Sequence, residues 1–172
     1  MKGLEIIVAT GVFAVALGCG GSGSNGGTGG GGGDPSGGSD PMDGSWNLVS
    51  ETCDGTPVSV TGINVSVIMT VQGSSGSWDT TIVDPGGDTC AMSIPMTLFY
   101  PAVGSVTWTY GALTSTPATC LSNSGATNVS GMLHAGTYVV EGNQLTLTEE
   151  TAPEDDLGCP GGRAVLTFRK PN

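Results

Sequence analysis

The sequence offers few side chains that could carry out catalysis. His134 is the one histidine of the 172 residues, and no catalytic or metal-binding motif surrounds it. An imidazole can act as a general base or a metal ligand, but a place in a strand is enough to account for this one. The G-x-S-x-G sequence of a hydrolase nucleophile elbow is missing. We therefore expect no catalytic residue, no cofactor and no enzymatic activity.

One segment is rich in carboxylates, the ligands that calcium prefers. Five acidic residues fall within eight positions: Glu149, Glu150, Glu154, Asp155 and Asp156. A calcium ion needs six to eight oxygen ligands, and a loop of this composition could supply several. The segment has no D-x-D-x-D-G pattern, however, and acidic loops usually face water. We expect no metal there.

The charge balance restricts the partners. The chain has 4 Lys and Arg residues against 15 Asp and Glu residues, a formal net charge of −11. Proteins that bind nucleic acids or anionic membrane surfaces need clustered Lys and Arg to neutralise phosphates. The composition therefore argues against a nucleic-acid partner and against a basic membrane-binding patch.

The N-terminus has the pattern of an export signal. Lys2 precedes an apolar run from Ile6 to Leu17, which at twelve residues is too short to cross a bilayer as a helix. The stretch Ala16-Leu17-Gly18-Cys19 that follows resembles the lipobox of bacterial lipoproteins. The resemblance implies that residues 1–18 are a signal peptide and that Cys19 becomes lipidated. In that family, Gly20 after the cysteine favours the outer membrane over the inner membrane of the cell envelope.

The next segment is predicted to be a tether. Residues 19–43 follow the signal, and twelve of the nineteen residues from Gly20 to Gly38 are glycine. Such a composition cannot bury enough apolar area to offset the loss of chain entropy on folding. We expect a disordered linker that joins the lipidated cysteine to one folded domain over residues 44–172.

The folded domain is predicted to be all-β. Apolar and polar residues alternate along most of it, and Gly, Asn and Pro clusters separate the runs. Eight strands are expected, over residues 45–53, 62–71, 77–83, 90–99, 105–113, 132–140, 144–149 and 163–169. Regular short strands joined by turns indicate a sandwich or an up-and-down barrel. Pro95 lies inside the fourth strand and predicts a bulge or an edge there.

The sequences at the two ends of this domain resemble the signature of the lipocalin family. Gly44-Ser45-Trp46 opens the first strand as G-x-W, and Leu166 to Arg169 ends the last. Residues 136–148 are also similar to a hairpin of small bacterial lipocalin-like domains. The resemblance implies an eight-stranded antiparallel barrel, in which Trp46 packs at the closed end against Arg169. A META-type or other small β domain is the alternative.

Four cysteines remain once Cys19 is assigned to lipidation. No two of them lie within four residues, unlike the ligands of a zinc site, and an even number in an exported chain indicates two disulfides. In a barrel the first and last strands run antiparallel, so the end of the first meets the start of the last. We therefore predict the pairs Cys53–Cys159 and Cys90–Cys120.

The barrel suggests a function without covalent chemistry. An eight-stranded barrel encloses room for side chains or for one small ligand. We expect a monomeric, lipid-anchored envelope protein that holds a small apolar molecule. The inward residues that would line the pocket are Val67, Met69, Met92, Ile94, Met96 and Trp108. The rival hypothesis is a structural or protein-interaction module with a filled barrel, whose protein partner is unknown.

Overall fold

The computed structural model describes residues 42–58, 64–118, 120, 129–150, 159 and 162–171. The predicted signal peptide, Cys19 and most of the predicted linker lie outside these residues, and so do Glu154, Asp155 and Asp156. Across the described ranges, no helix is both long and apolar enough to cross a membrane.

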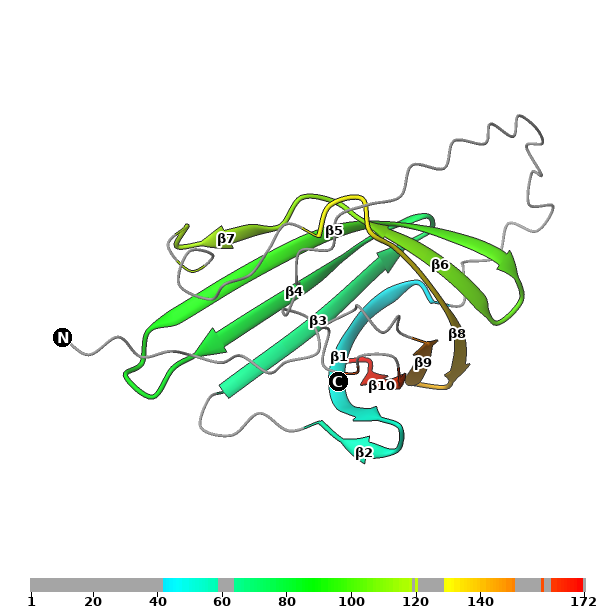
Figure 1. The fold of residues 1–172 in the computed structure, drawn as a ribbon, viewed down its shortest axis with the longest axis horizontal. Coiled ribbons are helices and arrows are strands. Elements are labelled where there is room, and N and C mark those ends of the chain that lie inside the picture. The colour runs from blue at the N-terminus through cyan, green and yellow to red at the C-terminus, as the bar shows by residue number, and fades with distance from the viewer. Residues whose placement is uncertain are drawn as a thin grey trace.

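Eight strands form a closed antiparallel barrel (Figure 1). Each pairs with the next along the chain, and the last pairs with the first. The strands are β1 (Gly44–Cys53), β3 (Asn64–Gln72), β4 (Ser75–Val83), β5 (Thr89–Ala102), β6 (Ser105–Tyr110), β8 (Leu133–Glu141), β9 (Gln144–Glu150) and β10 (Arg163–Arg169). The predicted all-β, up-and-down barrel is thus confirmed, and each predicted strand overlaps an observed one.

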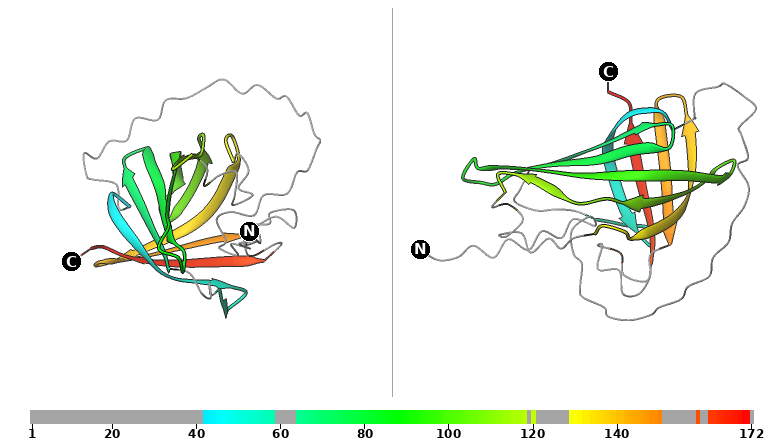
Figure 2. Two further views of the ribbon diagram at one scale, coloured as in Figure 1. Left: turned by 90° about the vertical axis from the view of Figure 1, so that its left-hand side faces the viewer. Right: turned by 90° about the horizontal axis from the view of Figure 1, so that it is seen from above.

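Two short strands add to this barrel. β2 (Thr56–Pro57) pairs with the end of β1, and β7 (Thr114–Thr116) pairs with the first part of β5. The long strands β3, β4 and β5 cross β9 and β10 at a steep angle, as the two views of Figure 2 show. Strands of a closed barrel tilt in this way, so side chains from opposite walls meet inside it.

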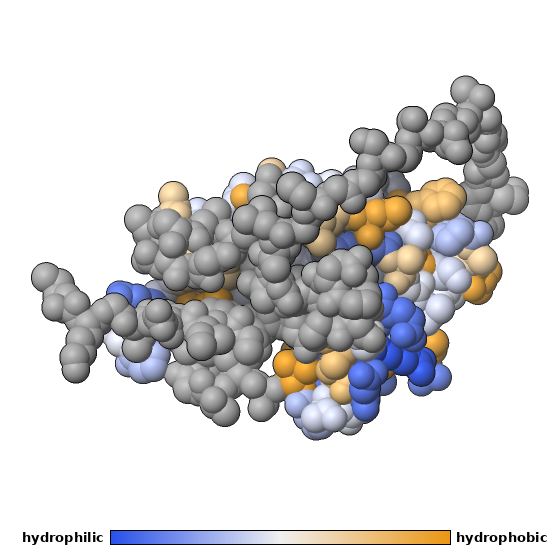
Figure 3. Space-filling view, viewed as in Figure 1, coloured by the Kyte–Doolittle hydropathy of each residue, from blue (hydrophilic) through white to orange (hydrophobic). Residues whose placement is uncertain are grey.

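Alternation along each strand separates the interior from the outer surface. In β3, Val67, Met69 and Val71 are buried, while the alternate positions Ser66 and Thr70 are exposed and Ile68 is partly buried. Successive side chains of a strand point to opposite faces, so a period of two places one set inside the barrel. On the face drawn in Figure 3, polar and apolar residues are interspersed among the coloured atoms.

The two ends of the barrel differ. At one end, here called the turn end, short turns join β3 to β4, β5 to β6 and β8 to β9. Gly73, Gly104 and Gly142 have positive φ angles of 57°, 77° and 61° in these turns, a conformation that glycine adopts without steric cost. The opposite end, the loop end, has the longer connections from β1 to β3, β6 to β8 and β9 to β10.

Pro95 lies in the middle of β5, where its neighbour on one side changes. β6 pairs with β5 from Met96 onward, and β7 pairs with it as far as Ser93. The carbonyl of Pro95 accepts a hydrogen bond from the amide of Gly111 at 2.7 Å, in the gap between these two strands. Proline has no amide hydrogen to donate, and this interruption in the pairing accommodates it. On its other side Pro95 pairs in register with Ser77.

Candidate functional site

The residues predicted to line a ligand pocket all lie inside the barrel. They are at most 5% exposed, and they come from β3, β5 and β6. Their side chains belong to one continuous apolar core: Val67, Met69, Met92, Ile94, Met96 and Trp108. This core is the wall that any molecule inside the barrel would contact.

The half of the interior near the turn end is filled by aromatic side chains. Trp46 of β1 and Phe168 of β10 are 0% exposed. Trp78 of β4 reaches Phe168 across the barrel, with 5.5 Å between the ring centroids. The indole N–H of Trp46 donates a hydrogen bond to the carbonyl of Met42 at 2.8 Å. This half of the barrel is therefore packed core.

The base that covers Trp46 is Lys170 and not the predicted Arg169. The ammonium group of Lys170 lies 4.8 Å from the centre of the Trp46 ring. Side chains alternate along β10. Leu166 and Phe168 point inward, so Arg169, the residue after Phe168, points outward and is exposed. Trp46 thus has the buried position expected of it, while the residue in contact with it is one place further along the chain.

The half near the loop end contains a polar pair. His134 of β8 and Glu149 of β9 are 5% and 9% exposed. A carboxylate oxygen of Glu149 contacts Nδ1 of His134 at hydrogen-bonding distance. A carboxylate only accepts hydrogen bonds, so Nδ1 carries the hydrogen. The remaining ring nitrogen, Nε2, accepts a hydrogen bond in the neutral imidazole and donates one in the charged form.

Aromatic rings hold this imidazole in place. The ring of Trp108 stacks on His134 with centroids 5.5 Å apart and an angle of 10° between the planes. The ring of Tyr110 meets the imidazole edge to face, at 4.8 Å and 61°. Both aromatic residues come from β6, which pairs with β8. The orientation of His134 is thus set by Glu149 on one side and by two rings on the others.

A second carboxylate, Glu51, is close to this pair. β1 has a bulge between Leu48 and Ser50, and Glu51 then pairs in register with the inward-facing Leu166. Burial raises the pKa of Glu51 above its ordinary value of 4.5, and the negative charge of Glu149 raises it further. A buried carboxylate, Glu149, and a partly buried one, Glu51, therefore lie near the loop end.

Tyr110 completes the polar half of the interior. Burial raises the pKa of its phenol well above the ordinary value of 10.0, and the charge of Glu149 adds to the increase. The phenol is thus neutral at physiological pH. A neutral phenol both donates and accepts hydrogen bonds.

Several buried polar atoms have no hydrogen-bond partner among the described residues. They are Trp78 Nε1, Thr80 Oγ1 and His134 Nε2, whereas the indole of Trp108 interacts with the phenol of Tyr110. Buried polar groups in folded proteins are nearly always hydrogen-bonded, to protein or to ordered water. Outside the packed half, Thr80 Oγ1 and His134 Nε2 are positions where a bound molecule or water would make hydrogen bonds.

The charges inside the barrel are unbalanced. Within the described part of the chain, the bases other than His134 are Arg163, Arg169 and Lys170, and all three are exposed. Arg163 pairs with Glu150 on the outer surface, with 3.6 Å between Nε and Oε1. His134 is therefore the one base near Glu51 and Glu149, and the arrangement can accept a positive charge.

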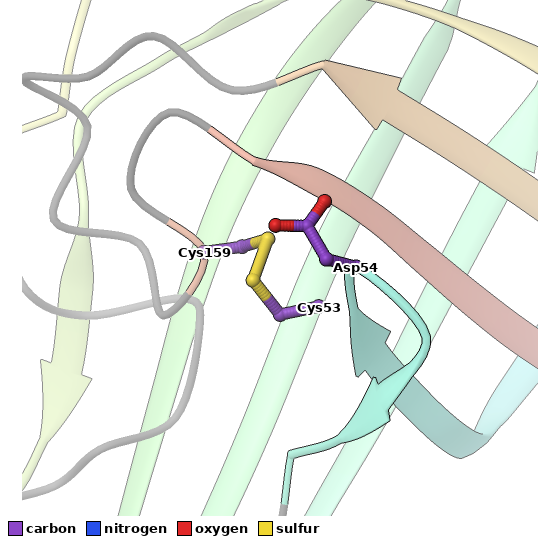
Figure 4. Close-up of side chains that lie close together, drawn as sticks. All are labelled: Cys53, Asp54 and Cys159. Carbon is purple, nitrogen blue, oxygen red and sulfur yellow. A yellow bond between two sulfur atoms is a disulfide. The ribbon is translucent and has the colours of Figure 1, made fainter.

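Both predicted disulfides are present. Cys53 bonds to Cys159 and Cys90 bonds to Cys120, with Cα atoms 5.2 Å and 5.8 Å apart. In Figure 4 the first bond links the end of β1 to the segment before β10, beside the carboxylate of Asp54. That carboxylate accepts a hydrogen bond from the amide of Arg163 at 2.9 Å. Asp54 thus has a structural role at this corner.

Neither Glu149 nor Glu51 was identified from the sequence as a residue of a site inside the barrel. Glu149 was grouped with Glu150 in the acidic segment, although alternation from Leu145 and Leu147 places it inside. Its neighbour Glu150 is exposed, so the two carboxylates lie on opposite faces of β9. Glu149 points into the barrel, so it does not share a face with Glu150 and the two could not bind one calcium ion together. For Glu51 no sequence signal was available, because the bulge in β1 resets the alternation.

Comparisons with known proteins identify no family. No family model matches the chain, and no curated protein matches it. Among solved structures, a redesigned β-barrel, mFAP1, bound to DFHBI is similar with a TM-score of 0.34 and 11% sequence identity. The match covers 76% of this chain and 95% of that one. The class stated here, a closed antiparallel up-and-down β-barrel, follows from the strand pairing.

Proposed function

We propose that this chain is a lipid-anchored lipoprotein of the bacterial cell envelope whose barrel binds a small, largely apolar molecule without transforming it. The observation that carries the proposal is that Thr80 Oγ1 and His134 Nε2 are buried inside an apolar barrel without hydrogen-bond partners among the described residues. Leaving such an atom unpaired costs about 1–3 kcal/mol. A bound molecule with its own hydrogen-bonding groups would offset this cost.

The interior supports a ligand with two kinds of surface. Buried aliphatic and methionine side chains of β3 and β5 favour an apolar body. His134 and Thr80 offer hydrogen bonds to a polar group of the ligand. Small-molecule sites commonly combine apolar walls with a few polar groups that fix orientation.

A filled barrel that acts as a structural or protein-interaction module is the alternative. The contact between Trp78 and Phe168 across the turn half favours it, because side chains there already occupy the interior. Five large apolar side chains on the outside would be available to a protein partner: Val49, Phe99, Val103, Leu133 and Val139.

Native mass spectrometry of the full chain, purified in detergent without reductant, tests the proposed function. The mass is compared before and after extraction with organic solvent. Loss of a discrete non-covalent mass would support ligand binding and identify the ligand's class. An unchanged mass, also after incubation with a lipid extract, would favour the filled barrel.

The lipid anchor is tested on the same sample. Acyl chains on Cys19 are covalent and survive extraction, so they are distinguished from a bound ligand. Two or three chains anchor a protein stably, whereas one holds it only marginally. We expect the native chain to enter the detergent phase on phase separation and Cys19→Ser to stay in the aqueous phase. Equal partitioning would contradict the anchor.

A further inference from the structure

We propose that the polar half of the barrel binds the protonated amino group of a small organic amine, whose hydrocarbon part lies against the apolar walls. This inference rests on the proposed function and names the class of ligand. Its site is the interior acid cluster, defined as Glu51, Glu149 and His134, together with the rings of Trp108 and Tyr110.

Charge is the first argument. Glu51 and Glu149 lie close enough for the charge of one to affect the other, and His134 is the one base beside them. The three bases in the rest of the described chain are on the outer surface. Burying like charges together is costly unless an opposite charge joins them. A cation inside the barrel would supply that charge.

The second argument is that polar side chains in the same half lack partners. Nε2 of His134 is buried and forms no hydrogen bond within the described residues. Glu149 is occupied on one side by His134, while no described residue donates a hydrogen bond to the side chain of Glu51. An ammonium group has three donors, which suits carboxylate oxygens and a neutral imidazole nitrogen.

The size of the site favours an organic cation over a metal ion. Metal ligands must approach within a few ångströms of one another to reach one ion. Among the described residues, one group of three acidic, histidine or cysteine side chains has its possible ligand atoms within 4.8 Å of one another. This group is Cys53, Asp54 and Cys159. Glu51, Glu149 and His134 do not form such a group.

Aromatic rings and apolar walls account for the rest of the ligand. Trp108 and Tyr110 both contact His134, so their rings border the same space as the carboxylates. Ring faces attract cations within about 6 Å. Met92 and Met96 of the neighbouring strand are buried in the same core and can adapt to an irregular hydrocarbon shape.

Calorimetric titration of the full chain in nanodiscs of neutral lipid tests this inference, with empty nanodiscs subtracted. The probes are 2-phenylethylamine, which is charged at pH 7, and 2-phenylethanol, which has the same shape without the charge. We expect the amine to bind at least tenfold more tightly. Glu51→Gln should weaken amine binding about tenfold and leave alcohol binding within twofold, while the outward Glu150→Gln changes neither.

Each other outcome would overturn the amine inference in a distinguishable way. If the alcohol binds as tightly as the amine, the barrel is a ligand site without cation preference and the proposed function stands. If neither probe binds and extraction releases no ligand, the proposed function fails too. If calcium or zinc alone binds and Glu51→Gln abolishes this binding, the cluster is a metal site.

Discussion

Lys170 covers the face of Trp46 at the turn end of the barrel, with 4.8 Å between its ammonium group and the ring centre. The indole beneath is fully buried and donates its N–H to the carbonyl of Met42. Lys170 also donates its backbone amide to the carbonyl of Asn143, in the turn between β8 and β9. One residue thus joins the first strand, the last strand and a turn.

Removing this cation should weaken the barrel slightly. We expect Lys170→Ala to lower the free energy of unfolding by about 0.5–1 kcal/mol, the usual contribution of an exposed cation–π contact. Arg169→Ala is the matched control, since Arg169 is the neighbouring base and points outward. Urea unfolding followed by tryptophan fluorescence measures both. Equal losses for the two variants would contradict a specific contact between Lys170 and Trp46.

The buried pair should show strong coupling in a double-mutant cycle. Replacing Glu149 by Leu removes the hydrogen-bonded partner of the buried His134 imidazole, and losing one member of a buried pair typically costs about 3–5 kcal/mol. The double variant His134→Leu with Glu149→Leu removes both polar groups, so it should lose less stability than the two single changes added together. Glu150→Leu, one residue away on the outer face, should change stability by about 0.5 kcal/mol or less. Additive losses would contradict the coupling.

Stability should depend on pH through Glu51. Its pKa is raised in the folded state, so the folded chain holds this proton more tightly than the unfolded chain does. The native protein therefore loses stability as pH rises from the ordinary value of 4.5 through the raised folded value. Above this window Glu51→Gln should be more stable than the native protein.

Thermal unfolding of both proteins from pH 4 to pH 8 tests this dependence. The difference in Tm between Glu51→Gln and the native protein should fall toward zero at the acidic end. A difference that is constant across the range would exclude titration of Glu51 as its cause. Gln at this position is expected to stabilise the fold while weakening amine binding, a combination that a purely structural role would not produce.

Gly136 of β8 lies against the Trp108 ring and the backbone of β9, where a side chain would have little room. A Cβ atom there would lie 2.5 Å from the carbonyl oxygen of Thr148 and 3.4 Å from the Trp108 ring. Because the first of these is backbone, Gly136→Ala should force a shift and cost about 1–3 kcal/mol. Thr137→Ala on the outer face should cost less than about 1 kcal/mol. Chemical unfolding of the two variants makes the comparison, and equal costs would contradict it.

The two disulfides should contribute unequally. Cys53 and Cys159 are separated by 106 residues and Cys90 and Cys120 by 30. In the chain-entropy model, closing the longer loop stabilises the fold by about 1 kcal/mol more. We expect Cys53→Ser with Cys159→Ser to lower the unfolding free energy more than Cys90→Ser with Cys120→Ser. Non-reducing peptide mapping should find these two pairs, and a Cys53–Cys90 peptide would contradict the strand order.

Much of the fold could be predicted because its signals are local. Alternating side chains and turn residues depend on neighbours in the sequence, and they predicted every strand of the barrel. The strand order then placed Cys53 beside Cys159, since β1 and β10 run antiparallel. The same alternation placed Met69 and Ile94 inside. Lipidation of Cys19 and the envelope location remain predictions.

The tertiary structure decided which charged groups are inside. One bulge in β1 turns Glu51 inward, and a bulge depends on pairing with a distant strand. Glu149 and His134 lie 15 residues apart on β9 and β8, and their contact depends on the register between those strands and on the packing of Trp108. By itself the sequence determined an apolar, disulfide-bonded barrel. The placement of buried Glu149 and partly buried Glu51 beside His134 depends on long-range pairing, which local patterns do not encode.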